Sequence, residues 1–148
     1  MRIFFSVLAI GIIIVSMPLY AQDVKTQGKS SYYAPYNTET VEFLDGTIYK
    51  IGRYPVFKGK FYMSYLMLSF VDQEGNYEYI TVHLGPSSFM EHQEIKLAEK
   101  DEIEVEGSLT PWRSGTKILV AAEITKDGKT IKLRDENGVP VWTKNQSK

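Results

Sequence analysis

The pattern of apolar and polar residues from position 38 onward predicts a protein built almost entirely of strands. Apolar residues either alternate with polar ones or form short runs between turn residues, and helical periodicity is nearly absent. Strands are expected in five segments: 38–57, 60–72, 77–85, 101–109 and 117–126. The first segment is long and is interrupted at Asp45-Gly46, where glycine suits a bulge or a sharp bend.

The segment 77–85, YEYITVHLG, shows the cleanest alternation in the chain. Ile80, Val82 and Leu84 should face the core, because successive side chains of a strand point to opposite sides. The other side then carries ring and hydrogen-bonding groups, which we call the tyrosine stripe: Tyr77, Tyr79, Thr81 and His83.

Pro86 interrupts the strand series and is expected to begin a short helix over 87–93, with Phe89 pointing inward. Farther along, Asn137-Gly138 between two apolar segments predicts a β-hairpin, and Trp142 is expected to pack back on the rest of the domain.

The order of these elements indicates the fold. Five strands, the first long and bent, with a helix between the third and the fourth, are the order of an OB-fold barrel. An immunoglobulin-like sandwich is the alternative, but it would need about seven strands. The expected fold class is therefore all-β, a five-stranded OB-fold-like barrel with a short helix between strands three and four and a C-terminal β-hairpin.

The chain begins with the order of a secretory signal peptide. Arg2 precedes an apolar run over 3–15, and Ala21 stands before polar residues, so cleavage is expected after Ala21. The run of about 13 residues is shorter than the roughly 20 that a membrane-spanning helix needs, although an uncleaved anchor is the alternative. Residues 22–37 lack periodicity and are expected to form a flexible arm before a single domain over 38–148. We therefore expect a periplasmic or secreted bacterial protein.

The composition excludes several kinds of chemistry. No cysteine is present, which excludes a thiol nucleophile, Cys-ligated zinc, an iron–sulfur cluster and haem attached through Cys-x-x-Cys-His. Ser87 and Ser88 follow Pro86 where serine commonly caps a helix, and no Gly-x-Ser-x-Gly elbow occurs. We expect no enzymatic activity and no cofactor. Removal of Arg2 with the signal lowers the 17 basic residues to 16 against 18 acidic ones, and this balance argues against nucleic acid as a ligand.

Three segments carry a resemblance to a known family: VHLGPSSF, DEIEVEGS and ILVAAEITKDGKTIKLRDENGVPVW. They resemble a group of small exported bacterial OB-fold proteins, similar to the domain of the magnetosome-associated MamS and MamX proteins and more distantly to stress-related periplasmic OB-fold proteins. The resemblance spans roughly residues 40–142 and implies an envelope OB-fold domain. Relatives that carry haem have Cys-x-x-Cys-His motifs, which this cysteine-free chain lacks, so no c-type cytochrome role is implied.

The leading functional hypothesis is a binding or accessory module. OB-folds commonly bind ligands across the second and third strands and the loops beside them. The tyrosine stripe could there stack on, and hydrogen-bond to, a protein, a peptide or a small envelope ligand. The same tyrosines could instead be covered by the N-terminal arm or the C-terminal hairpin.

The alternative hypothesis is a metal-binding or redox accessory protein. His83 and His92 could approach each other, and Glu91 could complete a site of two imidazoles and one carboxylate. The spacing speaks against this site, because zinc motifs usually hold their histidines closer together, as in His-x-x-x-His.

Overall fold

A computed structural model of the chain describes residues 35–146. The expected signal peptide over 1–21 and most of the expected arm over 22–37 lie outside the described residues. The strands are β1 (Val41–Val56), β2 (Phe61–Val71), β3 (Tyr77–Pro86), β4 (Glu102–Pro111), β5 (Lys117–Lys126) and β6 (Lys129–Lys132). The helical elements are α1 (Ser87–Glu91) and three 3-10 turns, η1 (Thr38–Thr40), η2 (Arg113–Gly115) and η3 (Val141–Gln146). No helix within the described range is long and apolar enough to cross a membrane.

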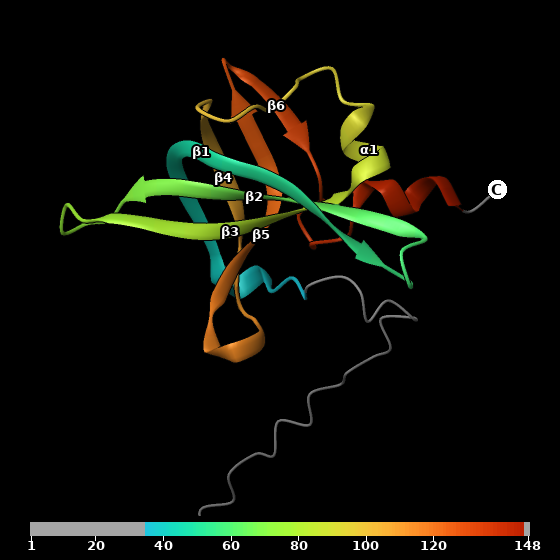
Figure 1. Cartoon of the computed structure of the whole chain (residues 1–148), viewed down its shortest axis with the longest axis horizontal. Helices are drawn as coiled ribbons and strands as arrows, with labels where there is room; N and C mark the ends of the chain where they lie inside the picture. Colours follow the sequence, from blue (N-terminus) through green and yellow to red (C-terminus); the bar gives the residue numbers. More distant parts are fainter. Residues whose placement is uncertain (1–34, 147–148) are drawn as a thin grey trace, which may run out of the picture.

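The strands form one sheet that closes on itself (Figure 1). The first half of β1 pairs antiparallel with β4, and its second half pairs antiparallel with β2. β2 also pairs antiparallel with β3. Residues 81–83 of β3 in turn pair in parallel with residues 118–120 of β5. Because β5 also pairs with β4, these contacts close the OB-fold barrel that the strand order predicted.

The bend in β1 lies where this strand changes partner. Thr47 pairs with residues of both β4 and β2, and a bulge follows between Ile48 and Lys50. A Cβ atom built on Gly46 would lie 2.3 Å from the carbonyl oxygen of Ser69. The bend predicted around Gly46 is confirmed, because only a residue without a side chain allows this close crossing.

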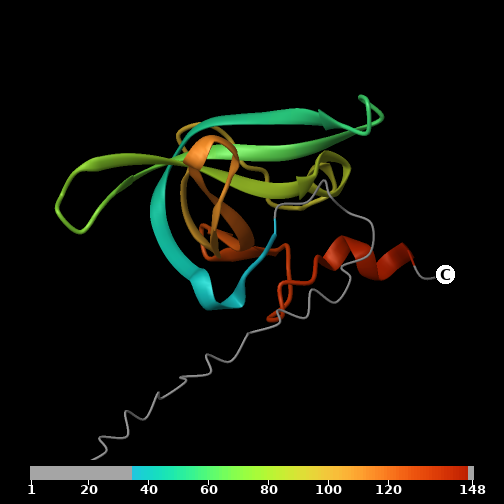
Figure 2. The ribbon, with the colours of Figure 1, turned by 90° about the horizontal axis from the view of Figure 1, so that it is seen from below.

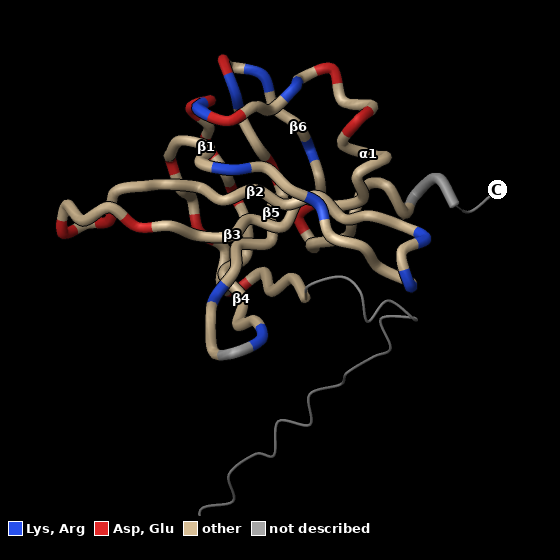
Figure 3. The backbone as a smooth tube through the Cα atoms, viewed as in Figure 1, with Lys and Arg blue, Asp and Glu red and all other residues tan. Residues whose placement is uncertain are grey.

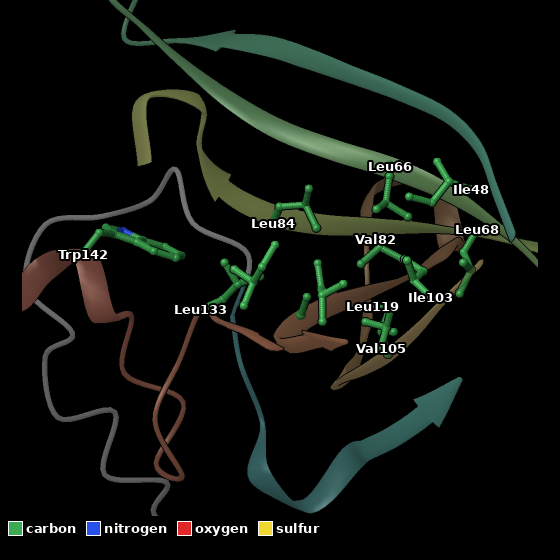
Figure 4. Packing of buried hydrophobic residues seen from close by; sticks show 13 residues of the cluster. Ile48, Leu66, Leu68, Val82, Leu84, Ile103, Val105, Leu119, Leu133 and Trp142 are labelled. Atoms are coloured by element: carbon green, nitrogen blue, oxygen red, sulfur yellow. The ribbon is translucent and has the colours of Figure 1, made fainter. Parts of the chain in front are cut away.

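The core fills the inside of the barrel with the side chains that the alternation pointed inward (Figure 4). Val82 and Leu84 of β3 are 0% and 2% exposed, whereas Ile80 is only half-buried. Ile103 and Val105 of β4 are buried in the same cluster. Each fully buried aliphatic side chain contributes roughly 1.5–3 kcal/mol, so this apolar interior is the main source of stability in a protein without disulfides.

Helix α1 closes one end of the barrel and is shorter than the predicted segment 87–93. It spans Ser87–Glu91, and His92 and Gln93 follow as a turn. Phe89 packs against the core as expected, and its ring centroid lies 5.4 Å from that of Trp142. The expectation that Trp142 packs back on the barrel is also confirmed, since its side chain is 8% exposed.

The end of the chain differs in detail from the predicted C-terminal hairpin. The turn is present, because Gly138 N–H donates to the carbonyl of Asp135 at 2.9 Å. However, only one bridge joins its two arms, between Arg134 and Pro140, and the chain then enters η3. Backbone hydrogen bonds flank this bridge on both sides, from Asp135 N–H to the carbonyl of Val139 and from Val141 N–H to the carbonyl of Leu133, and the pairing ends there because η3 begins at Val141. The residues before this turn instead form β6, a sixth strand that pairs with β5.

Candidate functional site

The structure divides the tyrosine stripe into two parts. Tyr77 and Tyr79 are 78% and 55% exposed and lie on the part of β3 that precedes its pairing with β5. The ring of Tyr79 makes an edge contact with that of Tyr49, with centroids 5.3 Å apart. Thr81 and His83 are half-buried and line a groove farther along the same face. Four residues that share one strand face therefore belong to two surfaces.

The groove has a volume of about 1110 Å³ and crosses the outward face of β1, β2 and β3. The β1–β2 turn and the loop between β4 and β5 flank it. Its lining is dominated by ring side chains: Tyr54, Phe57, Tyr62, Tyr65, His83 and Trp112. We call this surface the aromatic groove.

His83 belongs to the lining of the aromatic groove. Its Nδ1 is 3.4 Å from the hydroxyl of Tyr54, and its ring meets that of Trp112 edge-on with centroids 4.9 Å apart. Burial, and to a lesser extent the positive charge of Arg134, together lower the pKa of His83 to about 4. The imidazole is therefore neutral at neutral pH and offers one donor and one acceptor.

The register of β1 on β2 explains the position of the Tyr65 ring. Gly52 is the partner of Tyr65, and a Cβ atom at Gly52 would lie 2.5 Å from the Tyr65 ring. The tyrosine therefore lies across the bare backbone of β1, where its ring centroid is 6.3 Å from that of Tyr54. A glycine inside a strand is a known sign of such close approach, and this was the one sequence signal that could have pointed to Tyr65.

The comparisons with known proteins agree with the fold. The model of the MamS/MamX magnetosome protein family matches residues 40–131 of the chain. The chain belongs to this family. Its expected absence of enzymatic activity agrees with this membership. No curated protein matches the sequence of this MamS/MamX family member.

Solved structures similar to this family member include the following two. The N-terminal domain of PriB from Thermoanaerobacter tencongensis is 13% identical, with a TM-score of 0.48, covering 62% of this chain and 99% of the other. The small single-stranded DNA-binding protein from Streptomyces coelicolor is 18% identical, with a TM-score of 0.41, covering 59% of this chain and 91% of the other.

The charge of the aromatic groove differs from that of the whole chain. Lys58 and Arg113 belong to its lining, and no aspartate or glutamate does. The Arg113 guanidinium lies 5.6 Å from the Trp112 ring centroid, and Arg53 lies 4.8 Å from that of Tyr62. Figure 3 shows Lys and Arg on the two loops that flank the groove. The net charge argued against nucleic acid as a ligand, but at the groove this exclusion is not supported.

The residues of the metal hypothesis do not come together. His92 lies at the end of α1, is exposed, and places Nδ1 2.6 Å from the carbonyl oxygen of Ser88. His83 points into the aromatic groove instead. Among residues 35–146, no three His, Asp or Glu side chains are grouped so that they could hold a metal ion, and this includes Glu91.

Proposed function

We propose that this chain is an exported, non-enzymatic binding module of the bacterial envelope that recognises an acidic segment of a partner protein in the aromatic groove. The observation that carries the proposal is the lining itself, which combines six rings with Lys58 and Arg113 and contains no carboxylate. Ring faces attract apolar and aromatic side chains, and the two cations attract carboxylates. An extended acidic segment with one or more aromatic residues satisfies both requirements.

A protein fits this lining better than a nucleic acid does. The rings of Tyr54, His83 and Trp112 pack against one another, with interplanar angles of 47° and 68°. They therefore form a joined apolar floor, whereas proteins that bind single-stranded nucleic acid present separate ring faces on which successive bases stack. The signal peptide expected over 1–21 would also direct the chain to the envelope, where the available partners include other envelope proteins.

Binding of short peptides tests the chemistry of the groove. The probe is a peptide rich in glutamate that contains one tyrosine, titrated by fluorescence anisotropy against the chain without residues 1–21. We expect Trp112→Ala and the double variant Lys58→Glu/Arg113→Glu each to weaken binding at least about tenfold, because buried aromatic and arginine anchors dominate interfaces. Phe43→Ala is the matched control, since Phe43 is 73% exposed on β1 and is not part of the groove lining.

Two further probes decide the ligand class. A peptide of the same length with lysine in place of glutamate should not bind, because it would bring positive charge to Lys58 and Arg113. Preferential binding of an oligothymidylate over the acidic peptide would show that the ligand is a nucleic acid. Equal binding of the acidic peptide by the wild type and by Lys58→Glu/Arg113→Glu would remove the groove as the site.

Export is tested separately. A bacterial culture that expresses the full chain should yield a periplasmic protein whose sequence begins at Gln22, because the expected cleavage follows Ala21. A cell-associated protein that still begins at Met1 would favour the uncleaved anchor.

A further inference from the structure

We propose that the β2–β3 hairpin of one copy of this chain docks in the aromatic groove of another copy, so that the protein associates head to tail. This inference rests on the proposed function, because it uses the same groove, and it names one acidic segment that the groove accepts. The hairpin tip, defined as residues 71–79, has the sequence VDQEGNYEY.

The hairpin tip projects from the barrel. Figures 1 and 2 both show the β2–β3 hairpin reaching away from the body of the molecule, past the other strands. Over its first four residues, from Tyr77 to Ile80, β3 pairs with β2 alone. Its pairing with β5 begins at Thr81. One edge of this part of β3 is therefore not paired within the described chain, and the tip is accessible from both faces.

The tip is also rigid before any contact forms. The carboxylate of Asp72 accepts hydrogen bonds from the backbone N–H groups of Glu74 and Asn76, at 2.9 and 2.8 Å. The N–H of Asp72 in turn donates to the carbonyl of Asn76 at 2.9 Å. A segment that is already ordered loses little conformational entropy when it docks, which favours association.

The chemistry of the tip is the complement of the groove. It carries Asp72, Glu74 and Glu78 and contains no lysine or arginine. Its apolar side chains are outward: Tyr77 is 78% exposed and Val71 is 54% exposed. The groove contains rings and two cations without any acidic residue. Docking would thus pair opposite charges and cover exposed apolar surface in the same contact.

The geometry directs the tip to a second copy. The β2–β3 turn and the β1–β2 turn, which borders the groove, lie at opposite ends of the molecule in Figures 1 and 2. A short, hydrogen-bonded hairpin cannot fold back across this span onto its own groove. The contact joins two different surfaces, so it is heterologous, and each added copy would present a new tip and a new groove.

The association is expected to be weak and salt-dependent. A tip of this size covers less than the roughly 1,200 Å² that stable interfaces bury, which places the contact in the transient class. Its charged residues are largely exposed, so salt screens them. Sedimentation velocity of the chain without residues 1–21, over a range of protein and salt concentrations, is the suitable measurement.

Two variants, each blocked at one end, test the proposal. The groove variant is Lys58→Glu/Arg113→Glu, and the tip variant is Glu74→Lys/Glu78→Lys. Each variant alone should self-associate at least about tenfold more weakly than the wild type, because every contact between its copies would bring like charges together. A mixture of the two should associate again, since the intact tip of the groove variant fits the intact groove of the tip variant, and the lysine-bearing tip meets the glutamate-bearing groove with opposite charge. Circular dichroism establishes that both variants fold.

The variant that combines all four substitutions reverses both surfaces and should associate again. Lys100→Glu/Lys129→Glu is the matched control, because it changes the net charge as the groove variant does at exposed positions outside both surfaces, and it should associate like the wild type. A wild-type chain that stays monomeric at high concentration and low salt, or a mixture without a complex, would overturn the proposal. If the acidic peptide still binds the groove in that case, the proposed function stands and only head-to-tail association is lost.

Discussion

The hydroxyl of Tyr54 and Nδ1 of His83 lie 3.4 Å apart, although their strands β1 and β3 are not neighbours in the sheet. β2 runs between them, and Tyr65 is the β2 residue that pairs with His83. Their side chains therefore meet over the outward face of β2 and form the floor of the aromatic groove. His83 is half-buried there, outside the barrel, and this burial is the main cause of its lowered pKa.

The first prediction concerns the pH dependence of stability. Burial, and then Arg134, lower the pKa of His83 from 6.5 to about 4, so the unfolded chain binds a proton more readily than the folded chain between these values. The contribution of His83 is complete above pH 6.5 and is lost as the pH falls through about 4. The loss should be on the order of 2 kcal/mol after allowance for solvent at a partly exposed ring. Urea unfolding between pH 7 and pH 4 measures it, and His83→Gln should flatten the curve.

The second prediction concerns the bend of β1. A Cβ atom at Gly46 would meet the backbone oxygen of Ser69 at 2.3 Å, and a backbone group cannot move aside as a side chain can. Gly46→Ala should lower the free energy of unfolding by about 1–3 kcal/mol. Thr47→Ala, at the next and exposed position, should change it by less than about 0.5 kcal/mol. Similar effects of both substitutions in urea unfolding would contradict the role given to Gly46.

The third prediction concerns Gly52, where a substitution should move the Tyr65 ring without a large loss of folding stability. At Gly52 the neighbour of an added Cβ is the far end of the Tyr65 side chain, which can rotate away. Gly52→Ala should therefore cost less than about 1 kcal/mol of stability but should displace the Tyr65 ring from the groove floor. Titration with the acidic peptide should show weaker binding by this variant. Unchanged affinity would mean that the Tyr65 ring does not contact the ligand.

The fourth prediction compares the two tryptophans. Trp142 is 8% exposed and belongs to the core, and Gly85 lies so close that a Cβ there would approach its ring to 2.7 Å. Trp142→Ala should lower stability by about 3–5 kcal/mol. Trp112→Ala, in the half-buried groove wall, should lower stability far less while it weakens ligand binding. A reversed order in thermal unfolding would show that the C-terminal segment is not part of the core.

The sequence by itself determined the strand order, the inward faces and the position of the helix. These features follow from local rules: the two-residue period of strands predicted Val82 and Leu84 inside, and Pro86 marked the end of β3. Gly46 indicated the bend because a glycine inside a strand pattern is a local sign of a bulge or bend, although the crossing with Ser69 that requires it is a tertiary contact.

Only the tertiary structure decided which outward residues form a site. Alternation placed Tyr77, Tyr79 and His83 on one face, but it cannot tell where β5 begins to pair with β3. That pairing leaves the two tyrosines on the projecting hairpin. His83 instead meets Tyr54 and Trp112, which come from distant segments of the chain. Strand register and barrel closure depend on contacts between residues far apart in sequence, and no local pattern contains them.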